Sequence, residues 1–123
     1  MFDGFEPAHV DVGETTIFAR RKGRGAPVLL LHGFPETHLM WRDVAPALTE
    51  GFTIVCADLR GCGASGKPPS DGALAPHAKR ATARDMIRLM ETLGFRRFAV
   101  AGHGAPVAAA MKAYRREVAP GRR

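Results

Sequence analysis

The sequence is poor in the residue types that mark disulfide-bonded, metal-binding or membrane-spanning proteins. Its 123 residues include only two cysteines, Cys56 and Cys62, whose spacing matches no metal-ligand pattern. Such thiols are expected to stay reduced, as in a cytoplasmic protein. No apolar run approaches the roughly 20 residues that a membrane-spanning helix needs, and the first ten residues carry Asp3 and Glu6 instead of the apolar core of a secretion signal. We therefore expect a cytoplasmic protein without a metal, an organic cofactor or a membrane contact.

Basic charge is abundant, but it is concentrated at one end of the chain. The formal net charge is +6, yet the last twelve residues hold five basic side chains against the single acid Glu117. Tyr114 is the one aromatic residue among them, and no nucleic-acid-binding motif is present. The basic residues are interpreted as a solvated tail, so nucleic acid is not an expected partner.

Apolar strand patterns alternate with helical patterns along the chain. Two half-buried strands flank a turn at Gly13 and three strongly apolar strands follow; the five cover residues 8–12, 15–20, 27–31, 53–57 and 97–101. Helical spacing of apolar residues predicts helices over residues 39–50, 79–93 and 106–116, and Pro46 predicts a kink or a late start in the first. This alternation is typical of an α/β fold with a parallel sheet, here in a single domain.

The strand over residues 27–31 is the most apolar of the five. Its consecutive aliphatic residues predict a central strand that is buried on both faces. The strand stops at a turn with Gly33 and Pro35, which presents backbone N–H groups at its carboxyl end. In open α/β sheets ligands bind at that edge. A glycine- and proline-rich loop over residues 59–78 follows the next strand, and loops of that length are more often functional than idle.

Three short segments at strand ends together carry a family signal. They are His32-Gly33-Phe34-Pro35-Glu36 with Trp41 beyond it, Asp58-Leu59-Arg60-Gly61-Cys62-Gly63-Ala64-Ser65, and Ala101-Gly102-His103. In this order and spacing they resemble the N-terminal part of an α/β-hydrolase, in the branch of the haloacetate (fluoroacetate) dehalogenases and the similar epoxide hydrolases. The resemblance covers residues 8 to 103 and implies a truncated α/β-hydrolase fold, with an N-terminal β-hairpin, parallel strands and flanking helices.

The resemblance implies a reaction through a carboxylate nucleophile. In this branch the fifth strand runs into a sharp turn of sequence Gly-His-Asp-Arg/Trp-Gly, whose Asp attacks carbon to form an ester that a His-activated water hydrolyses. The N–H of Phe34 would help to hold an oxyanion or a carboxylate oxygen. His103 corresponds to the neighbour of the nucleophile rather than to a base. In the dehalogenases an Arg directly after the nucleophile grips the substrate carboxylate.

The chain departs from the family pattern at this turn. Gly104 occupies the nucleophile slot, Ala105 the Arg or Trp slot, and Pro106 the place of the closing Gly. Glycine has no side chain that could attack, and Pro106 restricts Ala105, whose N–H would be the second donor of the anion hole. Residues 104–123 read as a divergent basic tail without a catalytic His, its supporting acid or a cap domain. We therefore expect an incomplete domain that is inactive as written, which a deletion, a frameshift or a gene-reading error would explain.

Other conspicuous side chains have structural interpretations. His32 is expected to orient its loop by hydrogen bonds. Trp41 is expected in a helix core, and the alternative for it is a substrate-binding wall of the site. Asp58 and Arg60 are expected to form an ion pair that fixes their loop. Ser65 lacks the Gly-x-Ser-x-Gly frame of a serine esterase.

Three functions stay open on these grounds. The first is a haloacetate dehalogenase-type hydrolase acting on a small haloacid, and the second is an epoxide hydrolase-type relative; the residue that would separate them is missing at position 105. The third is a non-catalytic binding or interaction fragment. The last strand would lack a neighbour, so self-association through an exposed sheet edge is also predicted.

Overall fold

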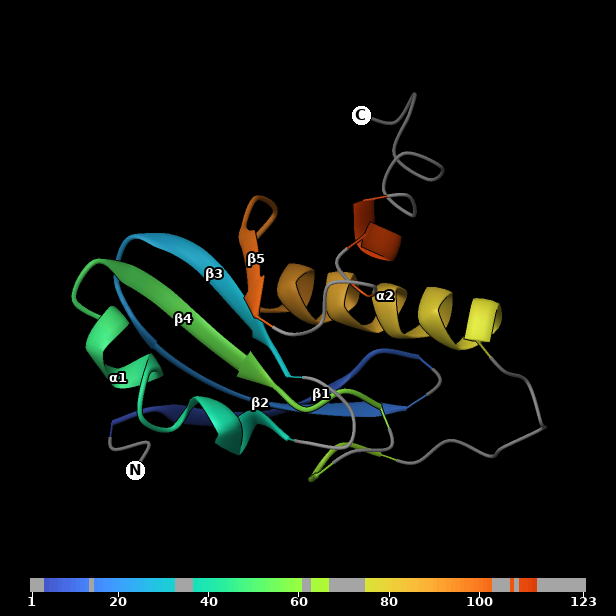
Figure 1. The fold of residues 1–123 in the computed structure, drawn as a ribbon, viewed down its shortest axis with the longest axis horizontal. Helices are drawn as coiled ribbons and strands as arrows, with labels where there is room; N and C mark the ends of the chain where they lie inside the picture. The colour runs from blue at the N-terminus through green and yellow to red at the C-terminus, as the bar shows by residue number, and fades with distance from the viewer. Residues whose placement is uncertain are drawn as a thin grey trace.

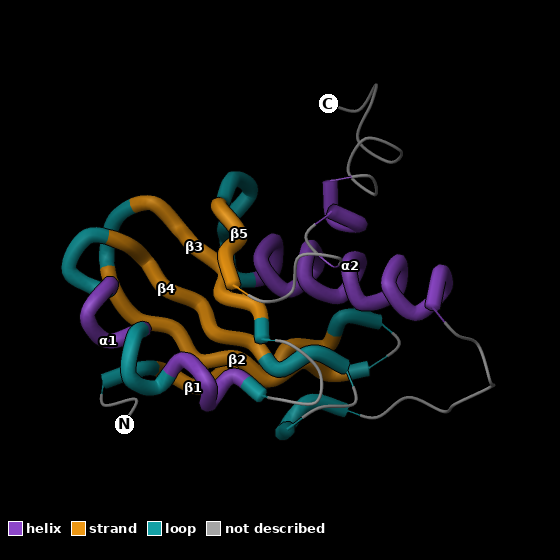
Figure 2. Tube along the Cα trace, in the orientation of Figure 1, coloured by secondary structure: helices purple, strands orange, loops and turns teal. Residues whose placement is uncertain are grey.

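A computed structural model describes residues 4–13, 15–32, 37–60, 63–66, 75–102, 107 and 109–112, with the backbone alone for residues 75–79. Five strands form one mixed sheet in the order β1-β2-β4-β3-β5, and helices cover its two faces (Figures 1 and 2). The strands are β1 (Glu6–Asp11), β2 (Thr16–Gly23), β3 (Ala26–Leu31), β4 (Phe52–Ala57) and β5 (Ala99–Gly102); the helices are the 3-10 helix η1 (His38–Trp41), α1 (Ala45–Leu48) and α2 (Ala75–Thr92). Among the helices of the described ranges, none is long and apolar enough to cross a membrane.

The first two strands form the predicted antiparallel hairpin. Val10 lies opposite Ile17, and both side chains are buried. The neighbours of Val10 in β1 are exposed, as in a half-buried strand, whereas in β2 the neighbouring Phe18 is buried as well. Gly13 takes a φ of 110° in the turn, and its N–H donates to the Asp11 carboxylate at 2.8 Å. The hairpin then joins the rest of the sheet because β2 also pairs antiparallel with β4.

The three strongly apolar strands form the predicted parallel part of the sheet. β3 lies between β4 and β5 and is parallel to both. Leu29 and Leu31 face the helix α2, whereas Leu30 faces α1, so the strand is buried on both sides. The continuous apolar run of β3 is therefore explained by two covered faces.

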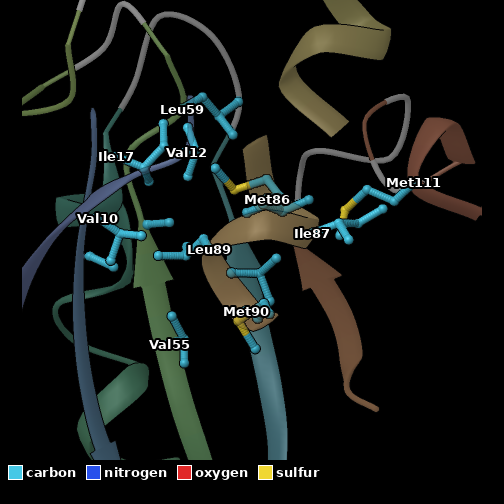
Figure 3. Packing of buried hydrophobic residues seen from close by; sticks show 14 of the residues in the cluster. Val10, Val12, Ile17, Val55, Leu59, Met86, Ile87, Leu89, Met90 and Met111 are labelled. Atoms are coloured by element: carbon cyan, nitrogen blue, oxygen red, sulfur yellow. The ribbon is translucent and has the colours of Figure 1, made fainter. Parts of the chain in front are cut away.

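Helix α2 covers one face of the sheet and forms the larger core with it (Figure 3). Its inward side chains follow helical spacing; they are Ala83, Met86, Ile87, Leu89 and Met90. Each large one contributes about 1.5–3 kcal/mol through burial of its apolar surface. The helix ends where Gly94 adopts a φ of 98° and the N–H of Phe95 donates to the Met90 carbonyl at 2.8 Å. The spacing of Ala83, Met86, Ile87 and Met90 in the sequence predicts this inward face, and the structure confirms it. The helix begins at Ala75, earlier than predicted.

The helix predicted over residues 39–50 is divided into two short pieces, so that prediction is wrong in its extent. Thr37 caps η1 by accepting a hydrogen bond from the N–H of Leu39 at 3.2 Å. Pro46 lies in the first turn of α1, where its missing N–H has no intrahelical partner to lose. The late start predicted from Pro46 is confirmed. Of the last predicted helix, residues 107 and 109–112 are helical and Met111 is buried, while Tyr114 lies outside the described residues.

Strand β5 is short and lies at the side of the sheet opposite the hairpin. It starts at Ala99 rather than at the predicted Arg97, and within the described residues it pairs with β3. Three of its four residues are exposed, and only Val100 is partly buried against the main core. The strand expected to have an open edge is therefore the least covered strand of the parallel set.

Candidate functional site

The candidate site is the edge of the sheet where the parallel strands end. β3 leads into His32, β4 leads into Asp58, and β5 ends at Gly102, so the three carboxyl ends meet there. Trp41 is the one predicted site residue that the structure describes. Phe34, His103, Gly104 and Ala105 lie outside the described residues.

His32 joins the ends of β3 and β4. Its ring is fully buried, and its Nε2 accepts a hydrogen bond from the N–H of Leu59 at 3.0 Å. A neutral ring that accepts at Nε2 carries its proton on Nδ1. The predicted structural hydrogen bonding of His32 is confirmed for the segment after β4, whereas its own loop, residues 33–36, lies outside the described residues.

Asp58 holds two separate segments with one buried carboxylate. Its Oδ1 accepts from the backbone N–H of His38 at 2.7 Å and faces the His38 Nδ1 at 2.8 Å. Its Oδ2 accepts from the N–H of Ala64 at 3.0 Å. Burial by itself would raise the pKa of Asp58, but the hydrogen bonds from His38 and Ala64 outweigh burial and hold this pKa below its usual value. The side chain is 1% exposed, so its charge is kept by these donors and not by water.

His38 was not identified from the sequence, and it is the main partner of Asp58. Its Nε2 accepts from the Nε of Arg20 at 2.9 Å, which leaves the proton of the neutral ring on Nδ1, facing Asp58. Both ring nitrogens thus have partners, and the ring lies 5.3 Å from that of Phe18. The arrangement fixes His38 and gives it no open nitrogen with which to act as a base. No sequence signal pointed to this histidine, because its partners lie 18 and 20 positions away.

The prediction that Asp58 and Arg60 form an ion pair is wrong. Arg60 instead makes a two-pronged contact with Asp85 of α2, with Nε to Oδ2 at 2.6 Å and Nη2 to Oδ1 at 2.9 Å. Asp85 is fully buried and the Arg60 side chain is 17% exposed. The pair therefore fastens the loop after β4 to the long helix rather than to its own strand end.

Ser65 is a structural residue. Its hydroxyl donates to the Asp58 carbonyl at 2.6 Å and accepts from the N–H of Phe18 at 2.8 Å. The N–H of Gly66 then donates to the Thr16 carbonyl at 2.7 Å. These contacts hold the loop after β4 against β2, and they agree with the sequence-based rejection of a serine esterase.

Trp41 spans from the smaller core to the end of β5. It packs against the cluster of Leu30, Ile54 and Cys56, as predicted for a core residue. Its ring also lies against Gly102, where an added Cβ would collide with the ring and with the Leu31 carbonyl. Gly102 has a φ of 114°, a conformation that other residues rarely adopt. The tryptophan thus touches the last strand residue before the turn that would carry a nucleophile.

Among the described residues near this edge, the remaining titratable groups form neither a metal site nor a reactive thiol. Within the described ranges no three His, Cys, Asp or Glu side chains gather closely enough to hold a metal ion. Cys56 is a free thiol in β4, and burial together with the nearby Asp58 charge raises its pKa to about 12. A thiol with so high a pKa is protonated and unreactive at neutral pH. Cys62 lies outside the described residues.

A pocket of about 550 Å³ lies at the opposite edge of the sheet. Its lining comes from the hairpin, the start of β4 and the end of α2, and includes Glu6, Arg21, Thr53 and Phe95. Arg21 there contacts Glu6 at 3.7 Å and donates to the Leu93 carbonyl at 3.4 Å. The pocket is therefore separate from the strand ends that hold the predicted site residues.

Comparison with known proteins agrees with the sequence motifs. A family model described as "alpha/beta hydrolase fold" matches residues 26–113. A fluoroacetate dehalogenase from Burkholderia sp is 52% identical over 103 residues, which are 84% of this chain and 34% of that protein. A soluble epoxide hydrolase from Corynebacterium sp. (strain C12) is 43% identical over 81 residues, which are 66% of this chain and 27% of that protein.

A solved structure supports the same assignment. The crystal structure of an epoxide hydrolase from Vigna radiata matches with a TM-score of 0.83 and 31% identity, over 95% of this chain and 38% of that one. The chain spans only about a third of the length of the dehalogenase and about a quarter of that of the Corynebacterium enzyme. The family resemblance and the fold class inferred from the sequence are both confirmed.

Proposed function

The chain belongs to the alpha/beta hydrolase fold family, and we propose that its carboxyl edge derives from the site of a haloacetate dehalogenase-type hydrolase. In the proposed reaction an aspartate carboxylate attacks the carbon that bears the halogen. The carbon–halogen bond breaks as the ester forms, halide leaves, and water then cleaves the ester. The substrate is a small haloacid, with no metal or organic cofactor, nucleic acid or membrane involved.

One observation carries this proposal more than any other. The 52% identity to a fluoroacetate dehalogenase extends over 84% of the chain. In this chain His32 fastens the end of β3 to the segment after β4, and Asp58 fastens that segment to His38 of η1. A fixed strand end is what backbone anion-hole donors such as the N–H of Phe34 require. We therefore assign Phe34 to the anion hole. Trp41 packs in the smaller core, and we propose that it meets the substrate only where its ring reaches the end of β5.

We further propose that this chain does not complete the reaction. Gly104 stands at the nucleophile position, and Ala105 stands where an Arg would hold the substrate carboxylate. Neither residue supplies the carboxylate nucleophile or the guanidinium that the reaction needs. His103 is proposed only as the neighbour of the nucleophile position. A cytoplasmic location belongs to the same proposal and suits the free Cys56 thiol.

Halide release tests both parts of the proposal. The gene region that encodes residues 98–123 is sequenced, and any frame that continues as Asp-Arg-Gly is restored in a second enzyme. With fluoroacetate and chloroacetate, the chain as given is expected to release no halide above the blank, and the restored enzyme is expected to turn over. A control returns the restored aspartate to glycine. Turnover by the chain as given would contradict the inactivity, and diol formation from epoxides without halide release would contradict the dehalogenase assignment.

An epoxide hydrolase-type function is the second candidate, supported by 43% identity to the Corynebacterium enzyme. A third candidate, non-catalytic binding of a small carboxylate, is favoured by the combination of a glycine at position 104 with intact anchoring of the strand ends. A titration of the chain with sodium acetate, followed by amide NMR, separates this candidate from the others. Saturable shifts at the Phe34 amide support it, and their absence refutes it.

A further inference from the structure

A continuous chain of contacts crosses the carboxyl edge from β4 to β5. Asp58, at the end of β4, holds both the backbone N–H and the ring of His38, the first residue of η1. Trp41, the last residue of η1, lies against Gly102, the last residue of β5. The helix η1 is one short turn, so its two ends move together.

The two ends of this connection are of different strength. Asp58 is 1% exposed and accepts charge-assisted hydrogen bonds, which are about twice as strong as neutral ones. The Trp41–Gly102 end is a van der Waals contact, made possible because residue 102 has no Cβ. β5 itself has three exposed residues and pairs with β3 within the described part of the chain. A weakly covered strand end is thus braced by a strongly held helix.

We propose that Asp58 is a positioning residue for the end of β5, acting through His38, η1 and Trp41. The inference rests on the proposed function, because in this family the reactive turn follows the strand that ends at Gly102. Asp58 touches no reacting atom; it determines where the strand end lies. Reaction rates respond steeply to such placement, since a shift of about 1 Å costs up to about 100-fold.

His38 is the link between Asp58 and η1, and its ring is held on both sides. Its ring is held between Arg20 and Asp58, so the ring cannot turn without breaking one of the two contacts. Among the described residues, the charged groups that bind its ring are Arg20 from β2 and Asp58 from the end of β4. Protonation of Asp58 removes its charge and weakens both of its contacts to η1, so the connection is expected to loosen in acid.

The experiment uses the full chain and two readouts that need no catalysis. Trp41 is the only tryptophan, so its emission and its quenching by acrylamide report the contact at Gly102. Amide hydrogen exchange of Ala101 and Gly102 reports the end of β5. The variants are Asp58→Asn and His38→Gln, with Asp85→Asn as the matched control, since Asp85 is also a buried aspartate but is bound to Arg60.

Asp58→Asn is expected to expose Trp41 and to speed exchange at Ala101 and Gly102 by about 10- to 100-fold, as the loss of charge-assisted hydrogen bonds implies. His38→Gln is expected to do the same to a smaller extent, and it carries the test if Asp58→Asn does not fold. In the wild type Trp41 emission should change as the pH falls below the ordinary value for Asp, and in Asp58→Asn this change should be absent.

Two results would overturn the inference. One is that Asp85→Asn alters Trp41 and the β5 amides as much as Asp58→Asn, because the effect would then be general destabilisation. The other is an unchanged acid transition of Trp41 in Asp58→Asn. A lack of halide release by the restored enzyme refutes the dehalogenase assignment, and a lack of acetate binding refutes the carboxylate-binding candidate. Both results leave these readouts unaffected, so the two failures are distinguishable.

Discussion

The buried pair of Arg60 and Asp85 permits a quantitative test of how the loop after β4 is fastened to α2. Asp85 is fully buried, and the guanidinium meets both of its oxygens at 2.6 and 2.9 Å. Arg60→Met would leave that carboxylate buried without its guanidinium, and breaking such a pair costs about 3–5 kcal/mol. Domains of this kind are stable by about 5–15 kcal/mol, so the loss would be a large fraction of the total.

The partner substitution should cost less, and the double variant should recover much of the loss. Asp85→Asn leaves a guanidinium that is 17% exposed and can reach water, so we expect about 1–3 kcal/mol. Arg60→Met with Asp85→Asn leaves no uncompensated charge and should be more stable than Arg60→Met alone. The free energies of unfolding of the wild type and of these three variants form a double-mutant cycle with a coupling of at least about 1 kcal/mol.

Urea unfolding followed by far-UV circular dichroism and by Trp41 fluorescence measures the cycle. Glu6→Gln is the control, because Glu6 contacts Arg21 at 3.7 Å and is 76% exposed; its loss should stay under about 1 kcal/mol. If the double variant loses as much as the sum of the two single variants, the coupling is zero. That result would refute the interpretation of the pair as a mutually compensated buried contact.

Three further outcomes follow from other features. Gly102→Ala should destabilise the protein by about 1–3 kcal/mol and alter Trp41 emission, because φ at residue 102 is 114° and the added Cβ collides with the Trp41 ring. Gly51→Ala is the control: the space around Gly51 is open, so thermal melts should stay nearly unchanged. Because the pKa of Asp58 is lowered on folding, its contribution to the free energy of unfolding is present above the unfolded pKa of 3.8 and is lost as the pH falls through the lower folded pKa. Thermal melts from about pH 5 to pH 2 should show this loss of stability, and a melting temperature that does not change with pH would contradict it. Sedimentation should show concentration-dependent association of identical chains through β5, and Ala101→Lys, a charge on the edge strand, should shift the protein toward monomer; an unshifted profile argues against that edge.

The sequence supported the fold because each element had a local signal. The apolar run of β3 indicated two covered faces, and helical spacing indicated the inward face of α2 around Met86 and Met90, both confirmed. The prediction of a single helix over residues 39–50 was wrong because apolar spacing does not reveal where a helix is interrupted. Pro46 marked the restart, but nothing local showed that η1 would end at Trp41.

The site was less predictable because its contacts join distant positions. His32 was interpreted correctly, since it directly follows a strand end. Asp58 and Arg60 were paired on proximity in the chain, yet their partners His38 and Asp85 lie 20 and 25 positions away. Sequence spacing carries no information on such pairs until the sheet order brings the strand ends together.

The pairing of β3 with two strands has a consequence for the order of assembly. Leu29 pairs with Val55 on one side and with Val100 on the other, so the second contact closes a loop about three times as long. Closing this longer loop costs about 0.9 kcal/mol more in chain entropy than closing the β3–β4 loop, before the β3–β5 interactions form. The hairpin and the β3–β4 pair are therefore expected to form early, and β5 to dock late. A newly synthesised chain would then present an unfinished sheet to chaperones until β5 has joined it.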